Sequence, residues 1–255
     1  MSLFGKVAIV TGGARGIGAG IVRALAAQGA NISFNYVSPS SEKPALELVS
    51  EVREMGCKAT CIRADMSSPT APKELIEATL SRLETDKIDI LVNNAGLGGN
   101  APLDEITPEQ YERIMSVNVK SVIFMTQGVL PHLNWGGRIV NLSSVSARGG
   151  YSTQTVYAAS KAAVEAFTRV WATELGHKYG VTVNAVNPGP VDTEMYREAG
   201  PVHLARMEEQ NKKVPAAPRC GTEKDVADIV VFLSEERSRW VTGDVICANG
   251  GMVFT

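Results

Sequence analysis

The chain has 255 residues, 44% of them hydrophobic, and a formal net charge of -2 at pH 7. This balance argues against a broad charged surface for nucleic acid or anionic lipid, so we expect a small-molecule partner. No apolar run approaches the roughly 20 residues of a membrane span, and the sequence begins without the apolar core of a signal peptide, so we expect a cytoplasmic protein.

The cysteines and histidines show no spacing typical of a metal site. No two cysteines form a C-x-x-C pair, and the three histidines are scattered along the chain. We therefore expect no bound metal. Cys57 and Cys61 are expected to be reduced thiols near a strand, and a contact between them in space is the alternative.

The first predicted unit is a strand, a glycine-rich turn and a helix. Lys6–Thr11 is a short apolar run typical of buried parallel strands, and Gly12, Gly16 and Gly18 follow it before a helix that ends at Gly29. Glycines allow the backbone to approach a pyrophosphate, and the N–H groups at a helix start attract it. The unit therefore predicts a dinucleotide site, although tight turns also need glycine for conformation alone.

The end of the second predicted strand, Asn31–Tyr36, is expected to face the adenosine ribose. A carboxylate there would bind the ribose 2′-hydroxyl and indicate NAD. Tyr36 stands in its place, Ser38 follows, and Arg15 lies in the glycine turn. A guanidinium and hydroxyl groups suit a 2′-phosphate, so NADP(H) is predicted over NAD(H). The alternative for Arg15 is an exposed arginine at a turn.

The next elements extend the alternation of helix and strand. Glu42–Met55 is predicted as a helix and Ala59–Ala64 as the third strand, which ends at Asp65 and Met66. Asp65 is expected where it can accept a hydrogen bond from the adenine amino group, and the alternative is an ordinary turn before Ser-Ser-Pro.

The fourth predicted strand, Ile88–Val92, follows a helix at Pro72–Leu83 and runs into Asn94, Ala95 and Gly96. Asparagine at the carboxyl end of a central strand can tie neighbouring loops, and Ala and Gly leave room for a flat cofactor. The sequence Asn-Asn-Ala-Gly is also a common turn signal.

A long helix is predicted over Gln110–Leu133, with Asn118 inside it. Because asparagine is unfavourable inside a helix, its side chain is expected to contact backbone or water. The strand Gly137–Leu142 comes next and delivers Ser143 and Ser144.

Tyr157 and Lys161 are four positions apart in an Ala-rich run that is predicted as a helix to Tyr179. Residues at this spacing share a helix face, so the Lys161 charge is expected near the Tyr157 oxygen. A close cation would lower the pKa of the phenol from near 10 to ~7 and make it a general acid or base. The alternative is a chance spacing, with the ring packed and the lysine in water.

The last third of the chain predicts two strands, a helix and an irregular segment. Val181–Val186 and Val245–Ala248 are predicted strands, and Lys224–Ser234 is a predicted helix. Asn187–Thr193 is expected to end regular structure because two prolines and a glycine do not fit a central strand. Gly200–Pro218 is expected to be mobile, partly helical and able to close over a ligand.

Strands that alternate with helices, without a linker or repeat, predict a single α/β domain over 1–255 with a doubly wound parallel sheet. A substrate-loop segment is expected at about 190–218. The Tyr157 helix carries small residues suited to close packing, either against a second copy of the chain or within one subunit.

These motifs resemble those of the short-chain dehydrogenase/reductase family, over essentially the full length of the chain. The matching residues are Thr11, Gly12, Gly16, Gly18, Asn93, Asn94, Ala95, Gly96, Asn118, Ser144, Tyr157, Lys161, Pro188, Gly189, Val191 and Thr193. The resemblance implies a Rossmann-type sheet with strand order 3-2-1-4-5-6-7, a nicotinamide cofactor and a homotetramer or homodimer.

The resemblance also implies roles for the matching residues. Tyr157 would donate or accept the proton, Ser144 would hold the substrate oxygen, and Asn118 would retain a relay water. Lys161 would grip the nicotinamide ribose and lower the pKa of Tyr157. The residues expected to bind the cofactor are Gly12, Arg15, Gly16, Ile17, Gly18, Tyr36, Ser38, Asp65, Met66, Asn94, Ala95, Gly96, Tyr157, Lys161, Pro188, Gly189, Val191 and Thr193.

Arg15 and the missing carboxylate at Tyr36 resemble the NADP(H)-using branch of the family. The stretch that begins at Asn35 is similar to that of fungal polyketide-type ketone reductases and 3-oxoacyl carrier-protein reductases. We therefore expect hydride transfer from NADPH to the carbonyl of a polyketide, aromatic ketone or 3-oxoacyl substrate, with Tyr157 as general acid. The alternatives are a lyase or cyclase of a biosynthetic pathway on the same fold, and a non-catalytic NADP(H)-binding protein.

Overall fold

The computed structural model describes residues 1–198 and 200–254. Its centre is a parallel sheet with the order β3-β2-β1-β4-β5-β6-β7, which confirms the predicted fold class and strand order. The strands are β1 (Val7–Val10), β2 (Asn31–Tyr36), β3 (Ala59–Arg63), β4 (Ile88–Asn93), β5 (Leu133–Leu142), β6 (Thr182–Pro188) and β7 (Val245–Ala248). Ala199, in the predicted substrate-loop segment, lies outside the described residues.

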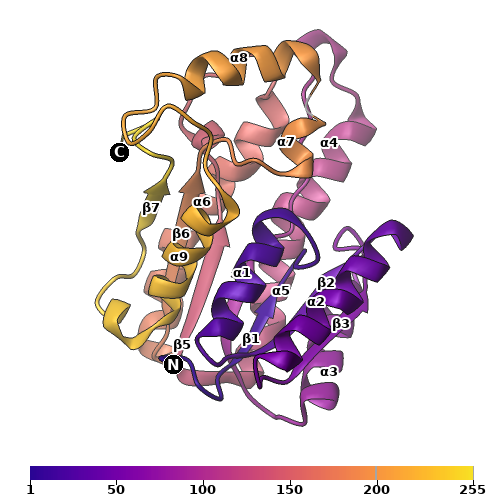
Figure 1. The fold of residues 1–255 in the computed structure, drawn as a ribbon, viewed down its shortest axis with the longest axis vertical. Helices are drawn as coiled ribbons and strands as arrows, with labels where there is room; N and C mark the ends of the chain where they lie inside the picture. Colours follow the sequence, from indigo (N-terminus) through magenta and orange to yellow (C-terminus); the bar gives the residue numbers. More distant parts are fainter. Residues whose placement is uncertain (199, 255) are drawn as a thin grey trace.

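Helices cover both faces of this sheet (Figure 1). The helices are α1 (Gly16–Ala27), α2 (Glu42–Glu54), α3 (Ala71–Leu83), α4 (Pro108–Met115), α5 (Ser121–Val129), α6 (Thr155–Tyr179), α7 (Glu194–Arg197), α8 (Pro201–Asn211) and α9 (Glu223–Ser234). One cluster of buried apolar side chains joins α1, α2 and α9 to the strands, and a second joins α3, α5 and α6. Burial on both faces explains why the central strands are almost continuously apolar.

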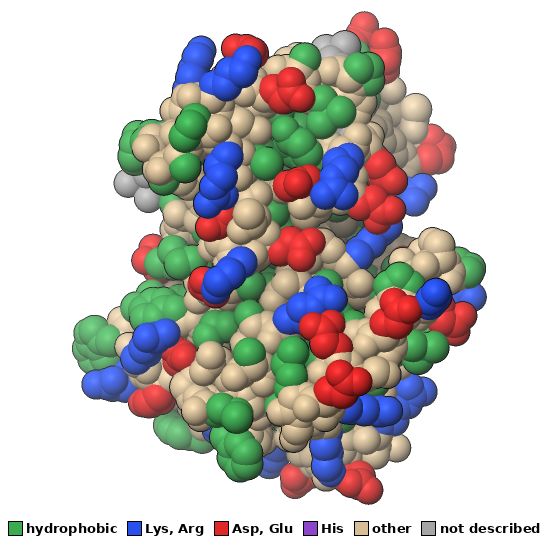
Figure 2. Space-filling model, in the orientation of Figure 1, with side chains coloured by type: hydrophobic (Ala, Val, Ile, Leu, Met, Phe, Trp, Pro, Cys, Tyr) green, Lys and Arg blue, Asp and Glu red, His purple; other side chains and the backbone are tan. Residues whose placement is uncertain are grey.

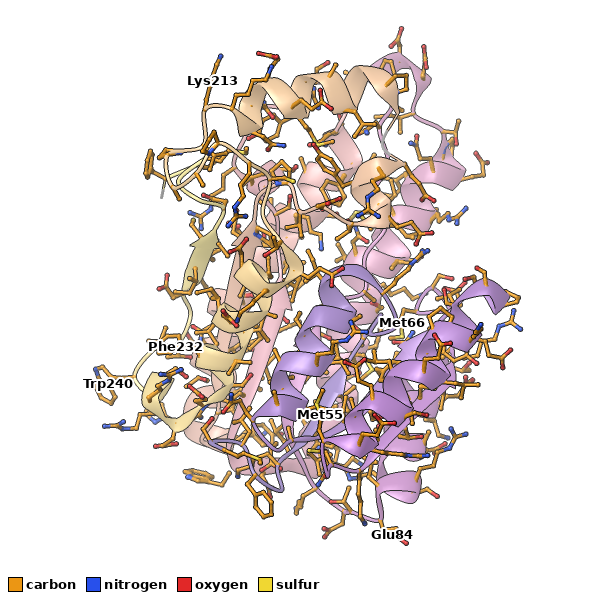
Figure 3. The ribbon with its side chains drawn as sticks, viewed as in Figure 1. Met55, Met66, Glu84, Lys213, Phe232 and Trp240 are labelled. Atoms are coloured by element: carbon orange, nitrogen blue, oxygen red, sulfur yellow. The ribbon has the colours of Figure 1, made fainter. Side chains whose placement is uncertain are left out.

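The surface mixes charges of both signs. Figure 2 shows Lys and Arg side chains interspersed with Asp and Glu on the face that it presents, as a net charge of -2 predicts. Trp240 is 95% exposed and points away from the ribbon (Figure 3). None of the helices in the described part of the chain has both the length and the apolar character that crossing a membrane requires.

The prediction of one helix over Gln110–Leu133 was wrong, because the chain changes geometry around Asn118. A π-helical turn, η3 (Ser116–Lys120), separates α4 from α5. In this turn the buried side-chain amide of Asn118 hydrogen-bonds to the main chain of Leu97, in the loop that follows β4. After α5 the chain passes through a short 3₁₀ turn at Leu130–His132, and β5 begins at Leu133, earlier than the predicted Gly137.

The prediction that regular structure ends at Asn187 was also wrong by two residues. Strand β6 continues through Asn187 and Pro188, which pair with β7. The ladder between β5 and β6 ends with the pair Leu142 and Val186. Pro188 is therefore accommodated where β6 has a strand on one side, so its missing N–H breaks no ladder with β5.

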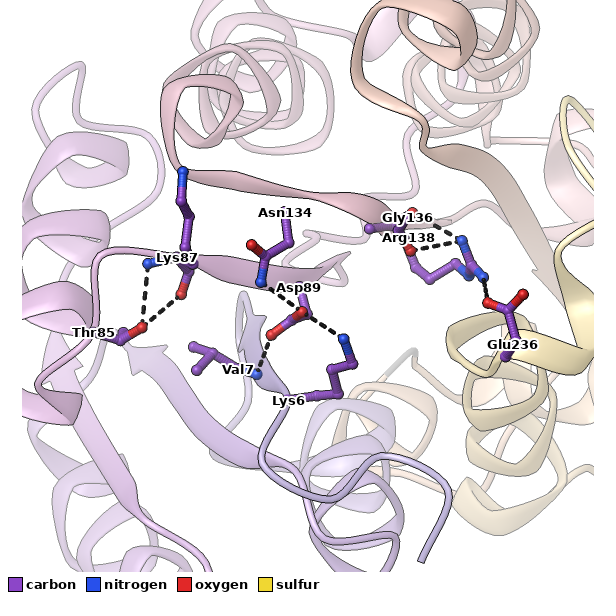
Figure 4. A network of polar contacts seen from close by, with 10 residues as sticks. Lys6, Val7, Thr85, Lys87, Asp89, Asn134, Gly136, Arg138 and Glu236 are labelled. Carbon is purple, nitrogen blue, oxygen red and sulfur yellow. Dashed lines mark hydrogen bonds and ion pairs between the residues drawn. The ribbon is translucent and has the colours of Figure 1, made fainter.

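A polar network ties three strands together at the edge opposite their carboxyl ends (Figure 4). The buried Asp89 on β4 accepts a hydrogen bond from the Val7 N–H of β1 at 2.8 Å. Its other oxygen accepts from Lys6 Nζ at 3.0 Å and from Asn134 Nδ2 of β5 at 2.8 Å. One carboxylate thus satisfies donors from both neighbouring strands.

We predict that Asp89→Asn lowers the free energy of unfolding by about 1–3 kcal/mol, because an amide keeps one acceptor oxygen and leaves a buried donor unpaired. Urea denaturation of the variant and the wild type measures this difference. Asp86→Asn, at an exposed position close in sequence, is the control and should change stability little. Equal stabilities for Asp89→Asn and the wild type would contradict the prediction.

Candidate active site

The predicted site residues gather at the carboxyl edge of the sheet. Strands β1, β4, β5 and β6 end there in neighbouring positions, because they are adjacent in the parallel order. The ends of β1 and β4 lead into the glycine turn and the Asn94 loop, and the end of β5 leads into Ser144. Crevices outside the carboxyl ends of parallel strands are where such folds bind ligands.

The glycine turn forms a cradle that side chains would fill. Gly12 and Gly16 have φ angles of +66° and +53°, which favour glycine. A Cβ at Gly18 would lie 2.2 Å from the carbonyl oxygen of Gly12. The first turn of α1 starts at Gly16 and includes Ile17 and Gly18, and N–H groups at a helix start lack intrahelical acceptors. This cradle fits a pyrophosphate.

Asn94 secures the cradle from the neighbouring strand. Its Nδ2 donates to the carbonyl oxygens of Thr11 at 2.8 Å and Gly12 at 3.1 Å. The main-chain N–H groups of Asn94 and Ala95 donate to Thr11 Oγ1. The amide nitrogen of Asn94 therefore holds the turn in shape, as the predicted tie between loops requires.

The end of β2 carries hydroxyl groups and a carboxylate. Ser38 Oγ lies 2.9 Å from Ser40 Oγ and 2.7 Å from Ser41 Oγ. The buried Tyr36 donates its phenolic hydrogen to Glu42 at 3.2 Å, and its burial and this carboxylate raise the pKa of Tyr36. The serine hydroxyls match the predicted 2′-phosphate side. The Tyr36 phenol itself is engaged with Glu42, a residue that sequence reasoning missed.

Arg15 lies in the glycine turn as predicted, and its guanidinium is exposed and paired with a partner on α7. Its NH1 lies 2.5 Å from Glu194 Oε2. Thr193, which caps α7 by accepting from Tyr196 N–H, has its Cγ2 3.3 Å from where a Cβ of Gly16 would lie. The chain at Thr193 and Glu194, where the predicted substrate-loop segment begins, therefore contacts the glycine turn.

Two of the predicted cofactor residues have side chains that face the core, and their contact with a cofactor stays a prediction. Met66 and Val191 are both buried and belong to the two apolar clusters. Only their main-chain groups could contact a cofactor. Asp65 is exposed, and its Oδ1 accepts from Ser67 N–H at 2.9 Å, so the turn that was the alternative for Asp65 is present.

Pro188 and Gly189 lie where β6 ends. Pro188 is the last residue of β6. A Cβ at Gly189 would lie 3.3 Å from Asn249 Cβ, so the chain passes close to the segment after β7. This close approach gives a packing reason for Gly189 besides the predicted contact with a cofactor.

Ser144, Tyr157 and Lys161 come together as predicted. The Ser144 side chain lies close enough to Tyr157 to lower the pKa of its phenol, and Ser144 Oγ accepts from Ser146 N–H at 3.2 Å. Lys161 Nζ lies 5.9 Å from the centre of the Tyr157 ring. Lys161 is 5% exposed and donates to the carbonyl oxygen of Leu142 at 2.7 Å. The alternative, a lysine in water, is therefore wrong.

The predicted lowering of the Tyr157 pKa by Lys161 was wrong for this structure. Burial raises the pKa of Tyr157, and the Ser144 side chain opposes this rise. Burial also lowers the pKa of Lys161 from 10.5 to about 8. The reason is that the Lys161 ammonium points toward the carbonyl oxygen of Leu142 and is itself destabilised by burial. The helical spacing of Tyr157 and Lys161 does not show this.

Asn118 has its amide engaged with protein groups. Its Oδ1 accepts from Leu97 N–H at 2.8 Å, and its Nδ2 donates to Leu97 O at 2.9 Å and to Ser160 Oγ at 3.0 Å. The backbone contact predicted for Asn118 is thus present. A Cβ at Gly96 would lie 3.4 Å from Lys161 Nζ and 3.6 Å from Asn118 Oδ1, which is ordinary van der Waals contact, so Gly96 lies directly beside these two side chains.

Two loops join beside Tyr157. Ala101 N–H donates to Thr153 O at 2.8 Å, and Thr153 has a φ of +71°, unusual for a β-branched residue. Tyr151, in the same loop, is half-buried, and a Cβ at Gly98 would lie 3.9 Å from Met195 Sδ. An aromatic and a thioether side chain therefore lie close to these loops, which are candidates for the substrate side.

Sequence reasoning missed a buried carboxylate behind this site. Glu165 lies one helical turn after Lys161 on α6 and is 5% exposed. It accepts hydrogen bonds from Ser143, Asn187 and Arg148. The signal available was its spacing from Lys161, but an Ala-rich helix does not show which face is buried.

Among the described residues, no group of three or more His, Cys, Asp and Glu side chains is arranged to hold a metal ion. The fold and the site define instead a dinucleotide-binding α/β protein whose hydroxyl, phenol and ammonium groups meet at the carboxyl edge of the sheet. A family model described as enoyl-(acyl carrier protein) reductase matches residues 12–253. The chain belongs to the short-chain dehydrogenase/reductase family of oxidoreductases.

Similar proteins support this assignment over the whole chain. The short-chain dehydrogenase/reductase FrzI of Cladobotryum sp is 48% identical, over 99% of this chain and 97% of that protein. The hydroxynaphthalene reductase-like protein Arp2 of Metarhizium guizhouense is 41% identical, over 99% of this chain and 96% of its own length. A blue fluorescent protein from a metagenomic library, solved in complex with NADPH, is 41% identical with a TM-score of 0.92, and the match covers 100% of both chains.

We predict that Lys161→Met makes the nucleotide-free protein more stable at pH 7, by about 1–3 kcal/mol, because it removes a buried charge. The folded-state pKa of about 8 lies below 10.5, so the unfolded chain binds more protons between these values. The wild type therefore gains stability as pH rises through this window, and the advantage of the variant shrinks.

Urea denaturation of both proteins at pH 7 and pH 10 measures this difference. Lys178→Met, at an exposed position on the same helix, is the matched control and should show no such pH-dependent advantage. A Lys161→Met protein whose stability relative to the wild type is the same at both pH values would contradict the prediction.

Proposed function

We propose that this protein is a reductase that transfers a hydride from NADPH to the carbonyl carbon of a ketone, with Tyr157 as the general acid. The observation that carries the proposal is that Tyr157 lies near both the Ser144 side chain, which lowers the pKa of the phenol, and the buried Lys161, whose Nζ is 5.9 Å from the centre of the ring. These groups lie at the same sheet edge as the glycine cradle. Acid–base chemistry beside a nucleotide site is what carbonyl reduction requires.

The cofactor is NADP(H), which supplies the hydride when bound. The cradle of Gly12, Gly16 and Gly18 fits its pyrophosphate, and Ile17 lies in the helix start that would attract this group. Arg15 and the Ser38 hydroxyl suit the 2′-phosphate. Ala95 and Gly96 leave room near Lys161 for the nicotinamide ribose, and the similar blue fluorescent protein was solved with NADPH.

The protein side chains then act on the substrate oxygen. Because burial raises the pKa of Tyr157, its phenol is neutral at pH 7 and has a proton to donate. Ser144 Oγ, fixed by Ser146 N–H, would donate a second hydrogen bond to the same oxygen. Lys161, whose Nζ lies 5.9 Å from the centre of the Tyr157 ring, would hold the nicotinamide ribose.

The proposed substrate class is a polyketide, aromatic or 3-oxoacyl ketone. The half-buried Tyr151 and the exposed Met195, near the loops beside Tyr157, offer apolar contacts for a flat substrate. The name of the relative Arp2, hydroxynaphthalene reductase-like, supports an aromatic ketone. The role of Asn118 in retaining a relay water stays a prediction.

We further propose a cytoplasmic homotetramer or homodimer. Cys57, Cys61, Cys220 and Cys247 are free thiols, which suits a reducing compartment. Phe124 on α5 and Val170 on α6 are exposed apolar side chains that a second copy could cover. The assignment of 1–255 to one catalytic domain, with a substrate-loop segment at about 190–218, stays a prediction.

We predict that Tyr157→Phe reduces kcat for ketone reduction by roughly 10²-fold or more, because general acid catalysis contributes on that order. The dissociation constant of NADPH should stay unchanged, since the ring remains. Initial-rate assays measure kcat, and fluorescence titration measures the dissociation constant of NADPH. Tyr111→Phe, at an exposed position, is the control.

Unchanged turnover in Tyr157→Phe would remove this residue from the mechanism. If the wild type binds NADPH tightly but reduces no member of a panel of ketones, quinones and β-ketoacyl thioesters, the protein is a non-catalytic binder. Product formation without consumption of cofactor would indicate a lyase or cyclase.

We predict that Arg15→Ala weakens NADPH binding by roughly 5- to 30-fold and leaves NADH binding nearly unchanged, because only NADPH carries the 2′-phosphate. Fluorescence titration with both nucleotides measures the ratio. Arg23→Ala, which removes an exposed arginine of α1 that is paired with Glu51, is the control. Equal losses of affinity for NADPH and NADH would contradict this role for Arg15.

A further inference from the structure

Glu165 is a buried carboxylate that the proposed chemistry does not use. It stands on α6 four residues after Lys161 and eight after Tyr157, so the three side chains share one face of the helix. Its side chain is 7% exposed. The oxygens of a buried carboxylate must accept hydrogen bonds from protein groups, because burying an unpaired charge is strongly unfavourable.

Three donors from three other segments meet this carboxylate. Oε1 accepts from Ser143 Oγ and from Asn187 Nδ2, each at 2.9 Å. Oε2 accepts from Arg148 Nε at 2.8 Å. Ser143 directly follows β5, Asn187 lies near the end of β6, and Arg148 follows the 3₁₀ turn after Ser144. Glu165 thus joins two strand ends and a loop to the helix.

These donors lie on both sides of Ser144. Ser143 precedes it in the chain, and Arg148 follows it by four residues. The same Asn187 amide that donates to Glu165 also donates to Ser144 O at 2.8 Å. The main chain around Ser144 is therefore fixed relative to α6, the helix that carries Tyr157.

We propose that Glu165 is a positioning residue that holds Ser144 in register with Tyr157 and Lys161. The expected effect on turnover rests on the proposed function. Glu165 would act through its hydrogen-bond partners and not through contact with the substrate. A buried ion pair gives little net stability over apolar residues of the same size, whereas its fixed hydrogen bonds restrict geometry. Small displacements of a reacting group reduce the rate strongly.

A carboxylate is required because all three partners donate. Glutamine has the same shape, and its single oxygen can still accept from Ser143 and Asn187. Its NH₂ group, however, would face the Arg148 guanidinium, whose side chain is 26% exposed. Replacing Arg148 by Met at the same time removes this conflict between donors.

The test measures kcat, KM and the dissociation constant of NADPH for Glu165→Gln at a temperature where circular dichroism shows the variant fully folded. We expect kcat to fall by about tenfold or more with NADPH affinity unchanged, since misplacement affects the reacting geometry. The double variant Glu165→Gln/Arg148→Met should recover most of this loss. Glu174→Gln, exposed on the same helix, should behave as the wild type.

A second measurement does not depend on turnover. The Ser144 side chain lowers the pKa of Tyr157, so displacement of Ser144 should raise it. Ultraviolet difference titration of each protein against its Tyr157→Phe counterpart isolates this phenol. If the wild type proves unable to reduce ketones, the proposed function fails, and this titration still tests the role of Glu165.

Unchanged kcat and unchanged Tyr157 titration in folded Glu165→Gln would overturn the proposal. A loss of kcat that the double variant does not recover, together with an unchanged titration, would also overturn it. If Glu165→Gln does not fold, the variant Ser143→Ala replaces it in the test, because it removes one donor to the same carboxylate. We then expect kcat to fall by about threefold or more.

Discussion

The buried ammonium of Lys161 is the constraint on which the site depends. Burial disfavours the charged form, so the pKa of this lysine falls to about 8. Its ammonium group donates to the carbonyl oxygen of Leu142, at the end of β5 and 2.7 Å away. The helix must therefore be held firmly against this strand end, because a small separation would leave a cation without an acceptor in an apolar interior.

Buried amides and hydroxyls provide that firm attachment. Asn93, at the end of β4, donates to Thr126 Oγ1 on α5 and to Asn141 Oδ1 on β5. Asn141 in turn donates to Thr168 Oγ1 on α6. These bonds join two strand ends to the helices that pack on them, and Glu165 continues the same pattern toward β6. Because each buried polar group has few alternative partners, the arrangement favours one geometry.

The opposite side of the cradle is held far more weakly. Arg15 and Glu194 form an ion pair between two largely exposed side chains, and such pairs contribute only about 0–1 kcal/mol. The substrate-loop segment thus rests on the glycine turn through contacts that are easily exchanged. Firm attachment of the proposed catalytic residues and weak attachment of the segment at about 190–218 are compatible with the proposal that this segment covers a ligand that enters and leaves.

The fold class and most element boundaries could be predicted from the sequence alone, and the family resemblance implied the strand order. The sequence also placed the glycine cradle and the meeting of Ser144, Tyr157 and Lys161. These features depend on local pattern: apolar runs, glycine at special φ angles and helical spacing.

The effect of burial on these groups could be seen only in the folded protein. The structure showed that Lys161 turns to Leu142, that the Met66 and Val191 side chains enter the core, that Asn118 opens a π turn and that Glu165 lies behind Ser144. The physical reason is that desolvation and hydrogen-bond partners arise from segments far apart in the chain. No local spacing reports which of them will meet.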